Sequence, residues 1–343
     1  MRTYFSDDNR LHFPQAELSG GQFVTPFERP SRVEYVRNRL LTQGMTDIRA
    51  PGPVDMAPAQ KLLDAGFLRF LETAYDDWKA EGMAGEVIAA NVPTRGMHQD
   101  RIPENIDGKV GYYCHASETA ITKGTWAAAQ SSLASAQHAQ AHVAAGARAA
   151  FALCRPPGHH ATKDQYGGYC FLNNAAIVAQ MMRDGGAAKV AVLDIDFHHG
   201  NGTQDIFYDR GDVFFASLHG DPRHGYPYFI GYADETGTGA GAGANINYPM
   251  PPGTPYSIWS QALDDAIAKI GAWGADALVL SLGVDAYKDD PISFFKLDSD
   301  DFTDAGRRVG AMGLPTVICM EGGYAIEAVG INTVNVLEGF EGA

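Results

Sequence analysis

The segment KVAVLDIDFHHGNGT, residues 189–203, contains the change of pattern on which the fold and the site both depend. Its first part, Val190 to Leu193, is an apolar and largely β-branched run of the kind that forms a strand buried on both faces of a sheet. Asp194, Asp196 and His198 then follow at alternate positions, and an extended backbone would point all three side chains to one side. The pattern predicts two carboxylates and an imidazole at the end of a buried strand.

Carboxylates and imidazoles are seldom buried without a partner. A divalent metal ion is one partner that compensates them, and a hydrogen-bonded Asp/His network that supports a turn is the other. Gly200 and Gly202 follow directly and allow the backbone to reverse before the next helix. The segment taken alone leaves both interpretations open.

Length, charge and cysteine spacing limit the classes of protein to which this chain can belong. The 343 residues are 45% hydrophobic and contain no internal repeat or low-complexity linker, which favours one domain over residues 1–343. With 41 acidic and 26 basic residues the net charge is −15, so a nucleic-acid partner is disfavoured and a cationic ligand is favoured. The four cysteines show no C-x-x-C spacing, which argues against a zinc ribbon or a disulfide framework.

Targeting signals are not recognisable in the sequence. The opening MRTYFSDDNRL lacks the apolar core of a signal peptide, and no apolar run approaches the ~18 residues of a membrane span. We therefore expect a soluble, cytoplasmic protein that does not associate with membranes.

From residue 149 onward, apolar strand-like runs alternate with segments of helical periodicity. This alternation predicts an α/β fold, in which a mostly parallel, multi-stranded sheet is flanked by helices and the active site lies at the C-terminal strand ends. Strands are predicted at 149–153, 189–193, 213–218, 277–282 and 315–320, and helices at 33–42, 58–80, 117–146, 174–183, 202–208, 256–273 and 300–312. Residues 82–113 show no clear periodicity, and a loop of that length is typical of a lid or a subunit contact.

Chemically reactive side chains follow each of the five predicted strands. They include the tandem His159 and His160, the Asp194 to His198 cluster, Asp285, and Tyr324 after a glycine pair. Because the carboxyl ends of parallel strands share one edge, these residues are expected to meet there. This convergence favours the metal interpretation over a simple hydrogen-bond network.

Asp196, His198 and Asp285 form the expected metal set. Two oxygens and one nitrogen are compatible with zinc and an open position for water, and equally with Fe(II), Mn(II) or Co(II).

The remaining groups supply the chemistry expected of a hydrolase. The tandem histidines suit general acid/base work on a metal-activated water, and the spacing allows Asp194 and Asn201 to fix their far ring nitrogens. The Tyr324 hydroxyl is positioned for a developing oxyanion. Together these groups indicate hydrolysis at a carbonyl centre.

The motifs resemble those of a known family. RPPGHHA, GYCFLNN, DIDFHHGNGTQ, SLH, SLGVD and EGGY occur in order from about Tyr112 to the C-terminus. They resemble the arginase–deacetylase superfamily and, within it, the histone-deacetylase-like metal-dependent amidohydrolases. A narrower similarity, to the bacterial branch that acts on acetylated polyamines, rests on RIPENID, GYYCHASETAI, SLHGDPRHGYPYFIGY, DPISFFKL and ELSGG.

This resemblance implies roles for the residues at the matching positions. It implies Zn²⁺, or Fe²⁺, on Asp196, His198 and Asp285, with His159 as electrostatic catalyst or proton donor, His160 as general base and Tyr324 as oxyanion donor. It implies a structural K⁺ held by oxygens of Asp194, Asp196, His198, Ser217 and Leu218. Asn201 stands where some members carry an aspartate, which should leave His160 less strongly polarised.

The resemblance also implies a substrate and an assembly. Tyr169 and Tyr226 match aromatic residues that line the family's acyl-lysine channel. In the acetylpolyamine branch an insertion matching residues 82–113 mediates dimerisation and narrows the active-site mouth, and a glutamate meets the cationic substrate. Glu118 is the matching candidate here, and Glu17 and Asp107 are further ones. The implied substrates are acetylputrescine, acetylcadaverine, acetylspermidine and acetylspermine.

Three other functions are alternatives to this assignment. A lysine deacetylase acting on acetyl-lysine peptides or other small acylated amines would use the same chemistry and stays open. A binuclear manganese ureohydrolase needs D-x-H-x-D and D-x-D motifs, whereas Asp285 is followed here by Ala286 and Tyr287, which leaves too few carboxylates. A non-catalytic metal-dependent binder is disfavoured because both tandem histidines and Tyr324 are present.

Overall fold

Eight parallel strands form the central sheet of the computed structural model, which describes residues 1–343. Their order across the sheet is β4-β1-β5-β10-β9-β6-β7-β8. The sheet strands are β1 (Arg2–Tyr4), β4 (Ile48–Arg49), β5 (Ala149–Ala152), β6 (Val190–Asp194), β7 (Val213–Gly220), β8 (Asn245–Met250), β9 (Ala277–Leu282) and β10 (Thr316–Met320). A separate antiparallel hairpin consists of β2 (Glu17–Ser19) and β3 (Gln22–Val24).

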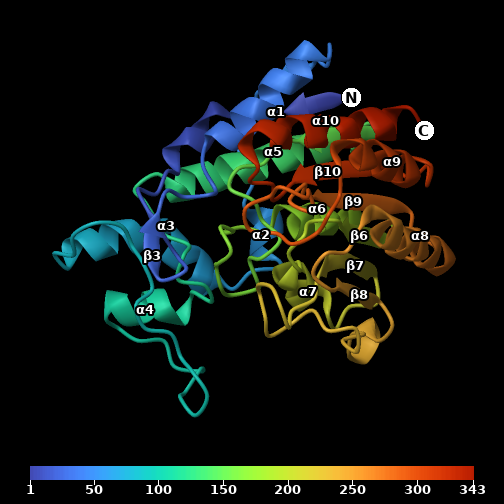
Figure 1. Cartoon of the computed structure of the whole chain (residues 1–343). Coiled ribbons are helices and arrows are strands. Elements are labelled where there is room, and N and C mark those ends of the chain that lie inside the picture. Colours follow the sequence, from blue (N-terminus) through green and yellow to red (C-terminus); the bar gives the residue numbers. More distant parts are fainter.

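Helices flank the sheet on both sides (Figure 1). They are α1 (Ser31–Thr42), α2 (Ala57–Gln60), α3 (Ala65–Ala80), α4 (Ile106–Tyr112), α5 (Thr125–Ala144), α6 (Asn174–Asp184), α7 (Asn201–Phe207), α8 (Tyr256–Trp273), α9 (Ser299–Gly310) and α10 (Ile326–Glu341). Helices α5 and α6 pack together against the sheet, and α10 packs between α1 and α9. Every residue of β6, β7, β9 and β10 is buried, which a strand achieves only when both of its faces are covered. None of the helices has the length and apolar character needed to cross a membrane.

The structure confirms the predicted single α/β domain and its parallel sheet, and it corrects several elements. The predicted helix at 58–80 is two helices. The first, α2, ends at Gln60, and Asp64 caps α3 by accepting a bond from the Phe67 amide at 2.8 Å. The predicted loop at 82–113 contains α4, which is capped by Asn105. Strands β1, β4 and β8 were not predicted.

The register of the central strands determines which side chains meet at the edge of the sheet. Strand β6 lies between β9 and β7, with Asp194 opposite Ser281 on one side and Ser217 on the other. On β10, Met320 lies opposite Leu282 of β9. The residues that follow these strands therefore leave the sheet side by side.

We predict that close backbone packing of α9 against α10 makes Gly306 sensitive to substitution. A Cβ atom at Gly306 would lie 2.0 Å from the carbonyl oxygen of Val336, so Gly306→Ala should destabilise the protein by about 1–3 kcal/mol. Gly271 on α8 has no atom within 4 Å of the corresponding position, and Gly271→Ala should instead stabilise by about 0.5–1 kcal/mol. Urea unfolding of both variants checks this, and equal midpoints would contradict the packing.

Candidate active site

The chain bends immediately after β6 instead of remaining extended. Asp194 is the last residue of the strand, and its Oδ1 accepts a bond from the Asp196 amide at 3.1 Å. Asp196 Oδ1 in turn accepts from the His198 amide at 2.8 Å. Two successive side-chain-to-backbone turns of this kind replace strand geometry. The expectation that Asp194, Asp196 and His198 project alike from one extended strand was therefore wrong, and Asp194 faces a different partner from the other two.

One nitrogen and two carboxylates converge beside the end of β9. His198 Nδ1 lies 2.9 Å from Asp285 Oδ2 and 3.3 Å from Asp196 Oδ1, and all three side chains are buried. Burial by itself would lower the pKa of His198, but hydrogen bonding to the two carboxylates raises this pKa to about 10. A proton thus compensates the carboxylates when no ion is bound. A donor set of one imidazole and two carboxylates fits a divalent ion such as zinc or Fe²⁺.

The absence of a side chain at Gly322 makes room for the two carboxylates of this cluster. A Cβ atom there would lie 2.5 Å from Asp285 Oδ2 and 2.6 Å from Asp196 Oδ2. The Gly322 amide also donates to Asp196 Oδ2 at 2.7 Å. Any larger residue would therefore displace both carboxylates.

The tandem histidines differ in their partners and hence in their charge. His159 Nδ1 lies 2.9 Å from Asp194 Oδ2, and His160 Nδ1 lies 2.6 Å from Asn201 Oδ1. Burial disfavours the imidazolium of His159, yet the Asp194 and Asp196 carboxylates raise its pKa to about 10. Burial and the neighbouring histidines hold the pKa of His160 well below its usual value. The pair therefore offers one charged imidazole and one neutral imidazole, as an acid/base site requires.

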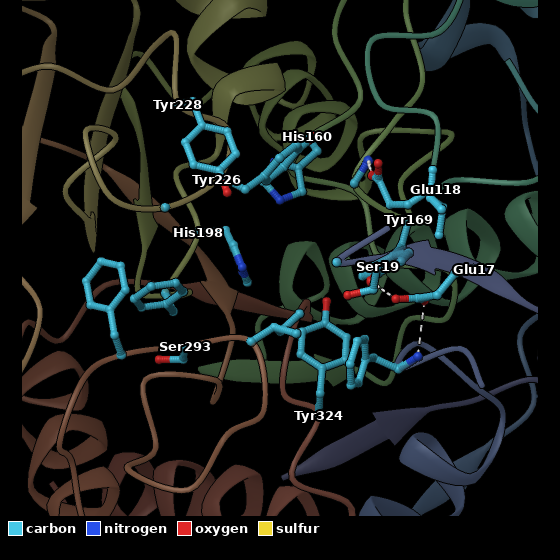
Figure 2. A pocket seen from close by; sticks show the side chains of 18 of the residues that line it. Glu17, Ser19, Glu118, His160, Tyr169, His198, Tyr226, Tyr228, Ser293 and Tyr324 are labelled. Carbon is cyan, nitrogen blue, oxygen red and sulfur yellow. Dashed lines mark hydrogen bonds between the residues drawn. The ribbon is translucent and has the colours of Figure 1, made fainter. Parts of the chain in front are cut away.

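Tyr324 directs its hydroxyl into the cavity that His160 and His198 line (Figure 2). Its backbone amide donates to Asp290 Oδ2 at 2.7 Å, and the Arg32 guanidinium lies 4.7 Å from the centre of its ring. Sequence reasoning missed Asp290 and Arg32. Asp290 opens the DPISFFKL segment, in which the sequence pattern gives it no role, and nothing near Arg32 in the sequence indicates its contact with Tyr324.

The cavity has a volume of about 380 Å³ and no lysine or arginine among its lining residues. Tyr169 and Tyr226 form opposite parts of its wall (Figure 2). The Tyr169 hydroxyl donates to Glu17 Oε1 at 3.1 Å, and the Tyr226 hydroxyl lies 3.2 Å from His115 Nδ1. A cavity with aromatic walls suits a slender apolar chain that carries a reactive amide at its tip.

Two carboxylates on one wall have few compensating charges. Burial raises the pKa of Glu17 to about 7, and burial likewise raises the pKa of Glu118. Glu118 Oε1 accepts a bond from the Gly168 amide at 3.2 Å, so this residue also holds the segment that carries Tyr169.

Asp107 is not brought to the cavity. It lies on α4 in the projecting insertion, where Asn91 donates to its carboxylate at 3.2 Å (Figure 1).

The backbone of the segment that carries Tyr169 has an unusual conformation. Tyr169 has a φ of 66°, which lies in the left-handed region that residues other than glycine rarely adopt. Its amide donates to Thr119 Oγ1 at 2.9 Å. Neighbouring Gly168 cannot carry a side chain, because a Cβ atom would lie 2.4 Å from the His160 ring. These contacts fix the aromatic wall close to the tandem histidines.

The residues expected around K⁺ lie at the ends of β6 and β7. Ser217 and Leu218 are buried, and Ser217 is in register with Asp194. The Ser217 hydroxyl lies 2.8 Å from His219 Nδ1, and the buried Ser281 hydroxyl on the other side of Asp194 has no hydrogen-bond partner.

A family model named the histone deacetylase domain matches residues 26–340, which include every residue of the metal cluster and every strand of the central sheet except β1. The chain belongs to the histone deacetylase family. It is therefore a deacetylase of the amidohydrolase type, and membership of this family implies a metal-dependent reaction.

Relatives within the histone deacetylase family match along the whole chain. An acetylpolyamine amidohydrolase of Mycoplana ramosa is 56% identical over 342 residues, covering 100% of both chains. Acetylpolyamine amidohydrolase 2 of Pseudomonas aeruginosa is 54% identical and covers 100% of this chain and 99% of its own. The crystal structure of an acetylpolyamine aminohydrolase from Burkholderia pseudomallei matches with a TM-score of 0.94 at 42% identity, covering 99% of this chain and 98% of that one.

We predict that Tyr324→Phe retains bound metal but lowers kcat by at least about 10²-fold, because the hydroxyl that faces a developing oxyanion is lost. Metal analysis and steady-state kinetics on an acetylated amine check both parts. Tyr35→Phe, at an exposed position on α1, is the matched control and should leave kcat unchanged. A kcat equal to that of the wild type in Tyr324→Phe would remove the oxyanion role.

Proposed function

We propose that this chain deacetylates acetylated polyamines, releasing acetate and the free amine. The single observation that carries the proposal is the pair of sparsely compensated carboxylates, Glu17 and Glu118, on the wall of an aromatic cavity without lysine or arginine. The proposed substrates are acetylputrescine, acetylcadaverine, acetylspermidine and acetylspermine. The names of the full-length relatives agree with this substrate class.

Cationic substrate atoms would relieve an electrostatic cost that the free protein carries. Burial disfavours a charged carboxylate, and an ammonium group close to it restores the charged form. Acetylpolyamines bring one or more ammonium groups on a slender chain, together with a neutral amide at the tip. A folded protein offers its acetyl-lysine on a bulky surface, which an entrance narrowed by the subunit contact proposed below would exclude.

The proposed metal is Zn²⁺, with Fe²⁺ as the other candidate, held by Asp196, His198 and Asp285. A divalent ion bound there supplies Lewis acidity toward the amide carbonyl and activates water. A second, structural ion, K⁺, is proposed on oxygens of Asp194, Asp196, His198, Ser217 and Leu218.

The chain's own residues then move the protons. His160 presents Nδ1 to the side-chain oxygen Oδ1 of Asn201, which leaves Nε2 free to accept a proton from the attacking water. His159, charged beside Asp194, stabilises negative charge and supplies a proton to the leaving amine. The Tyr324 hydroxyl donates a hydrogen bond to the oxyanion.

We further propose that residues 1–343 act as a homodimer of single-domain chains. The segment from residue 82 to residue 113 projects from the body of the molecule (Figure 1) and exposes apolar side chains. Val92, Met97 and Ile102 are 41%, 61% and 52% exposed. Such a surface favours a subunit contact, which would also narrow the active-site mouth. Asp107 would reach a substrate only through this contact.

We predict that the zinc-loaded protein turns over N-acetylputrescine and N8-acetylspermidine well above an acetyl-lysine peptide. Glu118→Gln keeps an acceptor for the Gly168 amide but removes the charge, so it should raise KM for the polyamines by about 10-fold or more and leave KM for the peptide unchanged. Glu118→Ala, which also releases the Tyr169 segment, should impair all substrates. Peptide turnover comparable to that of the polyamines would instead support a lysine deacetylase.

A further inference from the structure

Glu321 is a buried carboxylate that the proposed reaction does not use. It directly follows β10, and its exposed fraction is 0%. Its Oε2 accepts two backbone hydrogen bonds, from Gly158 at 2.7 Å and from His159 at 3.1 Å. Its Oε1 has no hydrogen-bond partner. A buried carboxylate is costly, so its presence beside the tandem histidines calls for a function.

The backbone around Glu321 is held on several sides. The Glu321 amide donates to the Leu282 carbonyl at 2.8 Å. Arg32 donates to the carbonyl oxygens of Glu321 at 2.6 Å and Gly323 at 2.7 Å. With the Gly322 and Tyr324 amides bound to Asp196 and Asp290, the segment that carries Tyr324 is fixed relative to the metal cluster.

The tandem histidines are on a different segment, which follows β5. No hydrogen bond joins this segment to residues 321–324 except the two that Glu321 accepts. The carboxylate therefore connects the segment of the two imidazoles to the segment of the tyrosine hydroxyl.

A metal ion is a less suitable explanation for this carboxylate. His159, Cys170 and Glu321 place donor atoms within 4.8 Å of one another. However, His159 Nδ1 already contacts Asp194 at 2.9 Å, and the Cys170 thiol donates to the Gly168 carbonyl at 3.3 Å. An ion bound through His159 Nδ1 and Cys170 Sγ would have to displace both contacts.

We propose that Glu321 is a positioning residue, which sets the tandem histidines at their working distance from the Tyr324 hydroxyl. This inference rests on the catalytic roles proposed above for those residues. The length of the side chain is the critical property, since Oε2 must reach two amides at once. A displacement of about 1 Å between reacting groups can cost on the order of 10²-fold in rate.

Two conservative variants separate reach from charge. Glu321→Gln retains the reach and an oxygen acceptor but removes the charge, whereas Glu321→Asp retains the charge and shortens the side chain by one methylene. We expect Glu321→Asp to lower kcat by about 10-fold to 10²-fold at unchanged KM, and Glu321→Gln to remain within about 3-fold of the wild type. Glu327→Asp, an exposed position on α10, is the matched control and should change neither parameter.

Steady-state kinetics on N-acetylputrescine should be accompanied by metal analysis and thermal unfolding of every variant. Unchanged metal content and melting temperature in Glu321→Asp would show that the kinetic loss is local. A wild-type kcat in Glu321→Asp, or an equal loss in Glu321→Gln, would overturn the positioning role. Failure of the proposed substrate would appear as absent turnover in the wild type itself, which is a different result.

Discussion

The cost of burying carboxylates at one edge of the sheet is the constraint on which the rest of the structure depends. Asp194, Asp196, Asp285 and Glu321 are all buried where the parallel strands end. Like charges this close destabilise one another unless cations or hydrogen bonds intervene. The fold meets this constraint with protonated imidazoles, backbone amides and, by proposal, a divalent ion. The same arrangement pulls the pKa values of His159 and His160 in opposite directions.

The wall of the substrate cavity also contains buried carboxylates. Glu17 and Glu118 are withdrawn from water without a lysine or arginine in the cavity, and burial raises the pKa of each. The free protein thus carries an electrostatic cost at its mouth that a cationic substrate would relieve. The metal cluster would select the amide and the wall would select the cation, so the two ends of one slender molecule are recognised separately.

The sequence predicts the centre of the fold well because its signals are local. Apolar runs that stop at Asp194 and Asp285 identify both the strands and the edge at which chemistry is expected, and the structure brings these side chains within hydrogen-bonding distance of His159 and His198. Short edge strands were missed, since β4 has only two residues and depends on pairing with β1.

Long-range contacts were beyond sequence reasoning. Arg32 reaches Gly323 across 291 positions of the chain, and no periodicity or spacing indicates such a pair. Asp107 belongs to the RIPENID motif, but a motif does not determine which way a side chain faces. Glu321 was visible beside the EGGY glycines, yet only the structure shows that its carboxylate binds the tandem-histidine segment.

The most direct test of the central claim is a titration of the chelator-treated protein with Zn²⁺, following acetate release from N-acetylputrescine. A single centre of one imidazole and two carboxylates predicts no release without metal, a linear rise on addition of Zn²⁺, and saturation at one ion per chain. Full activity in the metal-free protein, or saturation only at two ions per chain, would contradict the account.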